Sequence, residues 1–516
     1  MEKSESGWLT LLIVTLSVFT IVIDKTFLNV AIYTLIRDLN TNIQTIQAII
    51  TIYALVMASL MLVGGKLQDV FGRRKTFLIG ASIYGIGTII AALSMNSAML
   101  LLGWSILEGI GAALMLPATT SIVSGSYEGE SRAFALGIIS SMASGAGTIG
   151  PIIGGFLTTY YTWRYAFGLE LVIIIIILLF SRKISVFPPV MKWQDIDILG
   201  AINSSLGIFL IVFGVLLLNN PSNWSIAPYF IVTGVLLLII FYFTQKRRLN
   251  ENKLPLLDVT LFKDLSFTLG NIARMIMNFT IGGVTFVIPV FLQGVLGTSP
   301  LVTGLTLIPM SIGIFTMSFT AGKVSTRIQP RYILPIGFLA ALAGSIYLTL
   351  VFSPSTTVMT IIPGVLFLGI GMGIVFPHSA NIIFAVARRD QQPDASGILN
   401  TGINLGSSLG TAVLGVILIL GSFGTLAGGT GYYLPANHSN IQIKDINGLL
   451  GKTVSVNVHA SNTAVASVIN GNNPKTNAIN NSFNVVTVIL IIGLISSLFI
   501  PRKPIKHEEH CVTTPI

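Results

Sequence analysis

The chain has 516 residues, of which 53% are hydrophobic and only 9% are charged. So few charged side chains cannot cover soluble domains of this size, and the composition therefore excludes a soluble globular protein and indicates a lipid-facing exterior. A formal net charge of +10 would suggest nucleic acid as a partner of a soluble protein, but the basic residues lie mostly between apolar stretches, and we expect no nucleic acid.

Apolar stretches long enough to cross the hydrocarbon core, which takes about 20 helical residues, recur fourteen times along the chain. We expect an all-α polytopic membrane protein. No small-residue cleavage site follows the first stretch, so we interpret it as a membrane helix rather than a signal peptide. The predicted spans are approximately 9–34, 44–65, 75–95, 98–122, 133–157, 163–181, 197–219, 226–245, 265–294, 300–321, 332–353, 356–384, 395–423 and 482–500.

Positive charge alternates from loop to loop. The loops after the second, sixth, eighth, tenth and twelfth spans hold several Lys and Arg residues, whereas residues 94–98, 219–225, 294–300 and 353–357 hold none. Because cytoplasmic loops carry the excess of basic residues, we expect a multi-pass protein of the cell membrane with both termini cytoplasmic.

One outer loop is long, from about residue 424 to 481, and is rich in Asn, Gly, Ser and Thr. Asn437 and Asn480 in this loop, and Asn223 in another outer loop, match the acceptor pattern for N-glycosylation. A polar, partly disordered loop without modification fits the same composition.

The loop after the second span combines fixed charges with glycines. Asp69 at the end of one helix can pair with Arg73 or Arg74 across the loop, and Gly65 and Gly72 permit a tight turn between closely packed helices. We predict that this loop is a charge latch for a cytoplasmic gate. The loop closely resembles the signature loop of the major facilitator superfamily.

A weaker echo of this loop follows the tenth span, from Gly322 to Arg331, with Thr326 in the place of the acidic residue. Two echoing halves indicate an internal duplication, as in many transporters.

The fifth span carries small residues and a proline, Gly145, Gly150, Pro151, Gly154 and Gly155. Small residues let helices approach closely and proline bends the backbone, so ordinary helix packing is one explanation. The stretch also resembles the antiporter motif of drug-exporting members of the superfamily.

With two extra spans between its halves, the chain resembles the fourteen-spanner drug:proton antiporter branch of that superfamily from about residue 7 to 501. The resemblance implies two six-helix bundles, over residues 1–181 and 251–516, with two additional helices over 182–250. It implies a monomer, not an enzyme and without a cofactor, that exports small lipophilic or cationic compounds in exchange for protons. A nutrient or metabolite carrier on the same fold, or a membrane sensor without transport, remains an alternative.

Charged side chains inside predicted spans are costly and mark functional sites. The candidates for proton coupling or substrate binding are Asp24, Lys25, Glu108 and Arg274, on helices that line the central cavity of the resembled fold; Glu170 is a further intramembrane charge. Asp24 and Glu108 are the proton-site candidates. Either carboxylate could instead form a permanent ion pair with Lys25 or Arg274.

Two departures from the branch pattern bear on this site. Ser105 stands where the motif of the fourth span has an Arg, and Glu108 stands where it usually has Gln. Because Lys25 is next to Asp24, the cavity need not be strongly negative, and an anionic or zwitterionic substrate stays open.

The tail sequence from His507 to Cys511 has spacing that could bind a metal, but we expect a solvated tail and no metal site. Cys511 is the single cysteine, so no disulfide can form within one chain. The segment from Gly448 to Thr453 lacks the first glycine of a phosphate loop, so ATP-driven transport is not expected.

Overall fold

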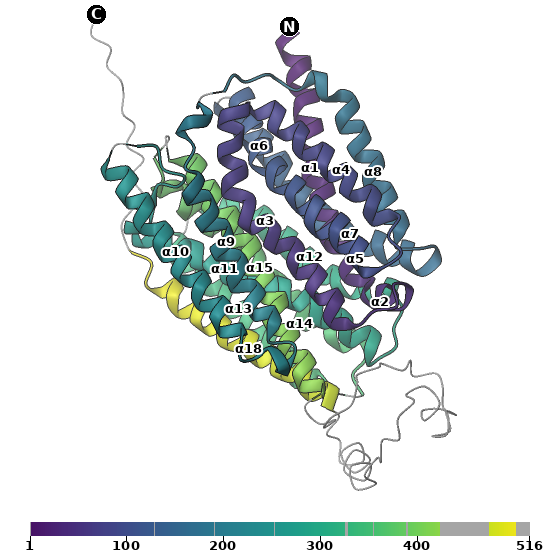
Figure 1. Cartoon of the computed structure of the whole chain (residues 1–516). Coiled ribbons are helices and arrows are strands. Elements are labelled where there is room, and N and C mark those ends of the chain that lie inside the picture. The colour runs from purple at the N-terminus through teal and green to yellow at the C-terminus, as the bar shows by residue number, and fades with distance from the viewer. Residues whose placement is uncertain are drawn as a thin grey trace, which may run out of the picture.

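The computed structural model describes residues 2–127, 129–189, 191–251, 253–325, 329–353, 355–388, 391–423 and 474–501. Long helices make up almost all of this part of the chain, and no strand occurs in it. Figure 1 shows that the helices run side by side as one bundle-like assembly.

The helices follow the predicted order. Those that cross the molecule are α1 (Glu2–Val30), α3 (Ile43–Phe71), α4 (Arg73–Ala92), α6 (Gly109–Ser126), α7 (Gly129–Tyr160), α8 (Arg164–Leu179), α9 (Ile198–Leu217), α10 (Ala227–Asn250), α11 (Leu265–Gly294), α12 (Pro300–Ser325), α13 (Pro330–Val351), α14 (Val358–Val386), α15 (Gln392–Phe423) and α18 (Pro474–Leu498). Shorter elements are α2 (Ile32–Asp38), α5 (Ser97–Leu100), the π-helix η1 (Leu101–Glu108) and the 3₁₀ turns η2 (Phe180–Lys183), η3 (Trp193–Asp195), η4 (Pro221–Asn223) and η5 (Val259–Lys263).

By length and composition, 13 helical segments of the described chain can cross a membrane. The fourth of them is continuous over Ser97–Ser126 and combines α5, η1 and α6. Helix α7, which is 32 residues long, occupies the place of the predicted fifth span. The prediction of an all-α protein with about fourteen spans is therefore confirmed.

Polar side chains fix where several helices begin. Asn42 and Asn96 accept hydrogen bonds from the backbone N–H groups of Thr45 and Met99, and Asp264 caps α11 in the same way. These caps satisfy N–H groups that have no partner inside a helix. Gly72, with φ of +87°, makes the tight turn from α3 to α4, a conformation that side chains with a Cβ rarely adopt.

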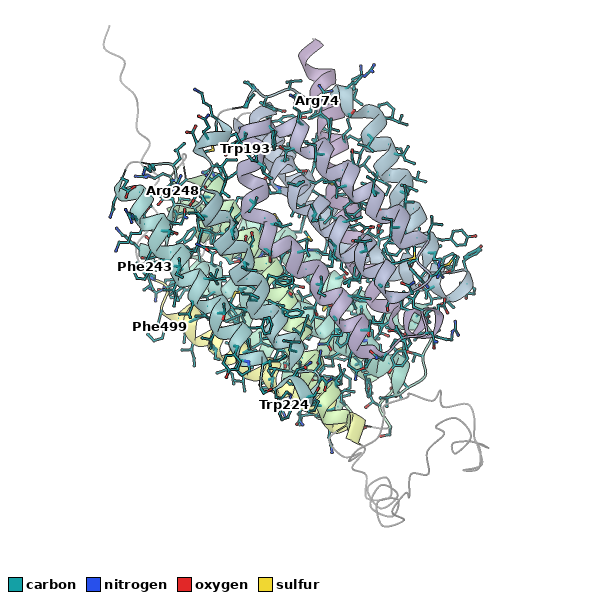
Figure 2. The ribbon with its side chains drawn as sticks, viewed as in Figure 1. Arg74, Trp193, Trp224, Phe243, Arg248 and Phe499 are labelled. Carbon is teal, nitrogen blue, oxygen red and sulfur yellow. The ribbon has the colours of Figure 1, made fainter. Side chains whose placement is uncertain are left out.

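The two ends of the assembly differ in charge. Figure 2 shows Arg74, Trp193 and Arg248 toward one end and Trp224 toward the other. Helix α1 begins at the end that carries the arginines. From the positive-inside rule we expect this end to face the cytoplasm, and we call it the cytoplasmic end; tryptophans at both ends suit the two membrane interfaces.

Helices α9 and α10 pack against each other beside the rest of the assembly. Helix α9 also contacts both α3 and α15, through an apolar cluster of Leu55, Ala58, Ile208, Val212, Leu216 and Ala412. The Ser205 hydroxyl on α9 donates to the Ser59 carbonyl on α3 at 2.7 Å. The additional hairpin thus lies along the seam between the N-terminal half (α1 to α8) and the C-terminal half (α11 to α18).

Some sequence features lie outside the described residues. These are most of the long outer loop with Asn437, the segment Gly448 to Thr453, the tail from His507 to Cys511, and Thr326 of the second signature loop. Asn480, expected in the outer loop, instead lies within α18, where its side-chain amide donates to the Phe352 carbonyl at 3.4 Å. The last helix begins at Pro474, before the predicted start at about residue 482. Residues 474–481 are mostly polar, so a search for apolar spans does not include them although they are helical.

Candidate transport site

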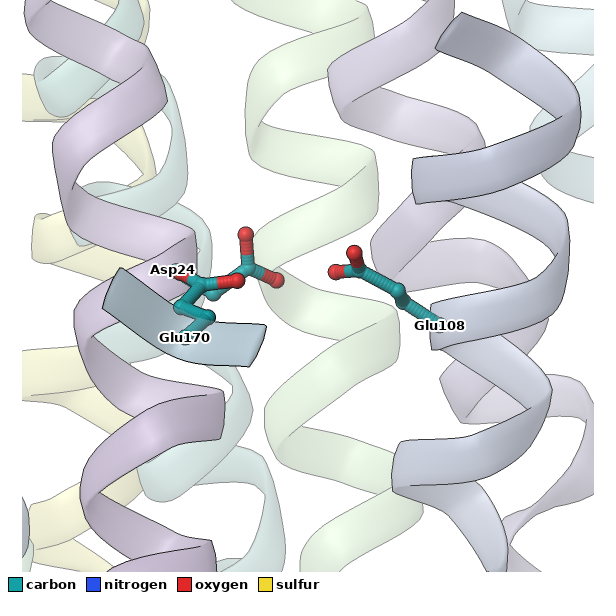
Figure 3. A group of neighbouring side chains, drawn as sticks. All are labelled: Asp24, Glu108 and Glu170. Atoms are coloured by element: carbon teal, nitrogen blue, oxygen red, sulfur yellow. The ribbon is translucent and has the colours of Figure 1, made fainter. Parts of the chain in front are cut away.

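Three carboxyl side chains from distant parts of the sequence meet inside the N-terminal half. They are Asp24 on α1, Glu108 at the end of η1 and Glu170 on α8, and we call them the carboxyl cluster. One oxygen atom from each lies within 4.8 Å of the others, and Figure 3 shows the three groups turned toward one another. At most 1% of any of these residues is exposed.

The carboxyl cluster has few hydrogen-bond donors. The Trp104 indole N–H donates to Asp24 Oδ1 at 2.6 Å, whereas Asp24 Oδ2 and both oxygens of Glu108 and of Glu170 have no hydrogen-bond partner. The buried hydroxyl groups of Tyr53 and Tyr84 lie beside the cluster, close enough to interact with the Asp24 carboxyl group, but neither forms a hydrogen bond of standard geometry among the described residues. The cluster is thus lined by polar groups that a proton or water can still join.

Helix geometry places these groups. The indole of Trp104 stacks on the Tyr53 ring, with centroids 4.9 Å apart and planes at 9°. Glu108 ends a π-helical stretch, a rare element that occurs mostly at functional sites. Close packing requires glycine beside it: a Cβ at Gly87 would lie 2.5 Å from the Gly103 carbonyl oxygen and 2.9 Å from Glu108 Cγ.

Ser105, which stands in the position of the expected Arg, serves in packing. Its buried hydroxyl donates to the Ile49 carbonyl on α3 at 2.7 Å. No basic side chain therefore enters the carboxyl cluster from this position.

The two basic candidates lie elsewhere, and we call Lys25 and Arg274 the basic pair. Lys25 Nζ donates to Asn404 Oδ1 on α15 at 2.6 Å. The Arg274 guanidinium on α11 lies 4.2 Å from the centre of the Phe376 ring on α14, and its Nε has no hydrogen-bond partner. Adjacent residues of a helix point about 100° apart, so Asp24 faces the N-terminal half while Lys25 faces the C-terminal half.

The permanent ion pairs that the sequence left open are not formed. Within the described residues, no nitrogen of Lys25 or Arg274 lies within 4.0 Å of an oxygen of Asp24 or Glu108. The sequence grouped these four residues as one site, but the structure separates them into a carboxyl cluster inside one half and a basic pair between the halves.

The signature loop makes a different ion pair from the expected one. No ion pair joins Asp69 to Arg73 or Arg74 in the part of the chain that is described. Arg73 instead donates to the Ser121 carbonyl at 2.7 Å and packs on the Phe187 ring. The loop's link to the other half is Lys66, whose Nζ lies 3.2 Å from Asp394 Oδ1 on α15.

Asp394 also belongs to a wider cytoplasmic network. Its Oδ2 accepts from the Asp258 backbone N–H at 2.9 Å, and the Asp258 carboxylate accepts from the Gln391 side chain at 2.6 Å. The segment before α11 is therefore fastened to the start of α15.

The glycines of the fifth-span motif lie where α7 contacts two other helices. A Cβ at Gly154 would lie 2.5 Å from Phe27 Cβ on α1, and a Cβ at Gly155 would lie 2.7 Å from the Pro300 carbonyl oxygen on α12. Gly150 likewise lies against Thr26, and the Pro151 carbonyl lies against Gly304. Gly145 has no such neighbour within 4 Å.

These contacts hold the halves together at the outer side. The Gln293 amide of α11 donates to the Val30 carbonyl of α1 at 2.8 Å, and the Thr159 hydroxyl of α7 accepts from the Leu301 N–H at 3.1 Å. Toward the cytoplasmic end of α7, glycine is not needed for such close contacts, because a Cβ at Gly137 would have no neighbour within 4 Å among the described residues. The outer side is thus closed along these helices.

Sequence reasoning assigned no role to Glu170, Trp104, Tyr53 or Tyr84. Glu170 was recognisable in the sequence as a charge inside a predicted span, and this signal could have placed it in the site. No comparable signal exists for the three aromatic residues, because aromatic side chains are common in membrane helices and these act through contacts between α1, α3, α4 and η1.

Many apolar spans with ionisable groups buried between them are typical of a polytopic membrane transporter. Comparison with known proteins agrees. The Major Facilitator Superfamily profile matches residues 14–195 and 196–411, more than half of the chain, and the chain belongs to this family.

Relatives of this chain have names that refer to drug resistance. It is 25% identical over 456 residues to the puromycin resistance protein pur8 of Streptomyces alboniger, covering 87% of this chain and 88% of that one. It is 28% identical over 412 residues to the multidrug efflux pump LfrA of Mycolicibacterium smegmatis, covering 80% and 81%.

Solved structures share the fold. The human organic anion transporter MFSD10 (TETRAN) superposes with a TM-score of 0.60 at 12% identity, covering 95% of this chain and 99% of that one. A bacterial homologue of the human lysosomal transporter Spinster, in an inward-facing conformation, gives 0.59 at 17% identity and 96% coverage of both.

Proposed function

We propose that this protein is a secondary active transporter that exports small lipophilic compounds in exchange for protons. The observation that carries the proposal is the carboxyl cluster, three buried carboxyl groups with one oxygen each within 4.8 Å and no basic side chain in ion-pair distance. The names of the relatives support export of drug-like compounds.

Electrostatics gives the cluster its affinity for protons. Two ionised carboxylates 4.8 Å apart repel each other by about 3.5 kcal/mol at an effective dielectric constant of about 20. Three negative charges without a counter-ion are therefore strongly unfavourable here, and proton binding relieves the repulsion.

Burial makes the cluster suitable for coupling. A coupled exchanger must keep its proton from reaching both sides of the membrane at once. The three residues have at most 1% exposure in this conformation, so a bound proton exchanges only after the helices around the cluster rearrange. Helix α1 carries both Asp24 in the cluster and Lys25, which points about 100° away from it toward α15. The helix can therefore transmit such a rearrangement to the seam between the halves.

The loops and motifs fit two gates. We assign the cytoplasmic gate to the signature loop with Gly65, Asp69, Gly72, Arg73 and Arg74, assisted by the bridge from Lys66 to Asp394. We assign the outer gate to the α7 motif where it contacts α1 and α12. Ligands that bind one of the two states more tightly shift the balance between them.

We also infer the setting of the protein. Its charge distribution supports a place in the cell membrane with both termini cytoplasmic. We expect a monomer. We also expect an N-terminal bundle over residues 1–181, two additional helices over 182–250 and a C-terminal bundle over 251–516. Contacts of α9 with both α3 and α15 support this division, because they place the additional helices along the seam between the two bundles.

Transport by purified protein in liposomes with an imposed proton gradient tests the proposal. Drug-like compounds should move against the proton flow, and Asp24→Asn, Glu108→Gln and Glu170→Gln should each lower gradient-driven transport at least tenfold. Glu251→Gln is the matched control, because Glu251 is a surface carboxylate paired with Arg247 and Lys253 and should transport normally.

The outcomes separate the alternatives. Transport that ignores the proton gradient in the unmodified protein would remove proton coupling. Gradient-driven transport that survives all three substitutions would remove the cluster from the mechanism, and gradient-driven uptake of a polar nutrient alone would favour a nutrient carrier.

A further inference from the structure

Lys25 on α1 and Arg274 on α11 form no ion pair with an acidic residue in the described part of the chain, although the charge of the adjacent Asp24 acts on Lys25. On α11, Asn271, Arg274 and Asn278 recur at helical spacing on one face. Arg274 is half-buried, its Nε has no hydrogen-bond partner, and Asn271 Oδ1 also lacks one. This face of α11 thus presents polar groups that are buried in the protein and still available for bonding.

The basic pair lies at one depth in the membrane. Lys25 is held by Asn404 on α15, and two residues further along α15 a Cβ at Gly406 would lie 2.5 Å from the Met275 carbonyl oxygen on α11. Two residues of a helix rise by about 3 Å. Lys25 and Arg274 therefore approach the same level of α15 from α1 and α11.

The helices of the C-terminal half offer almost no negative charge. Among α11, α12, α13, α14, α15 and α18, the one acidic residue is Asp394 at the cytoplasmic start of α15, and it is paired with Lys66. On α14, His378 is buried, and its Nδ1 lies 2.7 Å from the Ile374 carbonyl oxygen. The three intramembrane carboxyl groups of the N-terminal half, Asp24, Glu108 and Glu170, are turned toward one another in the carboxyl cluster.

An unpaired guanidinium in the middle of a membrane protein is costly, so it usually has a partner or a functional reason. Arg274 rests on the Phe376 ring, and Lys25 Nζ lies 5.8 Å from the centre of the Tyr53 ring. Aromatic rings beside basic groups suit a molecule with an apolar body and an anionic head group, because Arg and Lys form strong hydrogen bonds to oxyanions.

We propose that the basic pair binds the anionic group, a carboxylate or sulfonate, of a lipophilic substrate between the two halves. This inference rests on the proposed transport function, because it names the charge of the exported compound. It replaces the cationic substrate that the sequence resemblance implied with an anionic one.

Binding of two shape-related probes of opposite charge tests this inference independently of proton coupling. Naphthalene-1-sulfonate and 1-naphthyltrimethylammonium share the same ring system, and their binding to the detergent-purified protein is followed by naphthalene fluorescence or equilibrium dialysis. We expect the sulfonate to bind at least tenfold more tightly than the ammonium compound.

Substitutions then locate the site. Lys25→Gln and Arg274→Gln should each lower the sulfonate affinity at least tenfold, whereas Arg274→Lys, which keeps the charge, should lose less. Lys25→Glu should reverse the preference toward the ammonium probe. Arg164→Gln is the matched control, because Arg164 also packs on an aromatic ring, Trp163 at 4.3 Å, but at the outer end of α8.

Size-exclusion profiles establish that each variant is folded, and if Arg274→Gln is not, Lys25→Gln and Lys25→Glu decide. The inference is overturned if the unmodified protein prefers the ammonium probe, binds neither probe, or binds the sulfonate equally well in the folded neutral variants. Sulfonate binding that depends on the basic pair, in a protein that shows no gradient-driven transport, would support the site and contradict the proposed function instead.

Discussion

Each of the two neighbours Asp24 and Lys25 belongs to a different site. Asp24 joins Glu108 and Glu170 inside the N-terminal half, while Lys25 reaches Asn404 on α15. One turn of a single helix therefore connects the carboxyl cluster to the seam between the halves. Any change of charge in the carboxyl cluster acts on a helix that also carries one member of the basic pair.

A first prediction at this scale concerns the close approach of α7 to α1. Gly154→Val should destabilise the protein and abolish transport, because its Cβ would lie 2.5 Å from Phe27 Cβ and 2.7 Å from Phe27 Cα. Overpacking of this kind costs about 1 to 3 kcal/mol. Thermal unfolding of the protein in detergent measures the effect.

Gly137→Ala provides the control on the same helix, since a Cβ there has no neighbour within 4 Å. It should not lower the melting temperature and should raise it slightly, because Ala favours the helix over Gly by about 0.5 to 1 kcal/mol. Equal melting temperatures for both variants would show that α7 and α1 are not packed as closely as the structure indicates.

At the scale of elements, the seam between α3 and α15 is held at both ends. Near the outer end, the Gln47 amide donates to the Thr411 and Ala412 carbonyls at 3.0 Å. Near the cytoplasmic end, Lys66 and Asp394 form an ion pair. Helix α9 covers this seam, so the additional hairpin has contacts with both halves at the place where they would have to move.

The second prediction concerns this ion pair. Lys66→Gln or Asp394→Asn should increase the fraction of molecules whose cytoplasmic side is open along this seam, because one of the links from the signature loop to α15 is lost. We expect a change of about three- to tenfold in the equilibrium, in line with about 1 kcal/mol for a partly exposed pair.

The single native cysteine simplifies the measurement. In a Cys511→Ser background, a pair of spin labels at the cytoplasmic ends of α3 and α15 reports their separation. The exchanged pair Lys66→Asp with Asp394→Lys should restore the original distances in part, because it re-forms the ion pair but not the bond from the Asp258 N–H. Unchanged distances in the single variants would argue against a latch.

The third prediction concerns the attachment of the additional hairpin. Gln245 on α10 is fully buried, donates to the Asp197 carboxylate before α9 and accepts from the Leu256 N–H at 2.8 Å. Gln245→Leu leaves this N–H and part of the carboxylate without partners, which costs about 1 to 3 kcal/mol for each buried group. Its melting temperature should fall, whereas the surface variant Glu251→Gln should melt like the unmodified protein.

At the scale of the whole molecule, two assemblies of helices meet around the basic pair, and their outer ends are in contact. Tight contacts between α7 and α12 and between α1 and α11 close the outer side. The carboxyl cluster is enclosed in one half. In the proposed function, proton exchange and access to the space between the halves therefore require the same rearrangement of helices.

The fourth prediction follows from the charge of the substrate. Export of a monovalent anion in exchange for one entering proton moves two charges, and each charge contributes about 2.3 kcal/mol per 100 mV of membrane potential. A potential that is negative inside should therefore accelerate export even without a pH difference. Liposomes with a potassium gradient and valinomycin measure this, and a rate that does not respond to the potential would indicate electroneutral exchange.

The sequence by itself determined the class of the protein and the depth of its charges. Spans of about 20 apolar residues have to be helical in lipid, because backbone groups have no other partners there. The alternation of basic loops predicts the orientation, and the scarcity of intramembrane charges singled out Asp24, Lys25, Glu108, Glu170 and Arg274. These inferences depend on local properties, which is why they could be made without coordinates.

Only the tertiary structure decided which of these residues act together. Side-chain direction around a helix and the neighbours of each helix are set by packing between segments that are far apart in sequence. This packing brought Glu170 to Asp24 and Glu108, turned Lys25 away from them, and replaced the expected pairing of Asp69 with the bridge from Lys66 to Asp394. The apolar spans placed these charged residues in the membrane, and the rotation and packing of the helices determined their partners.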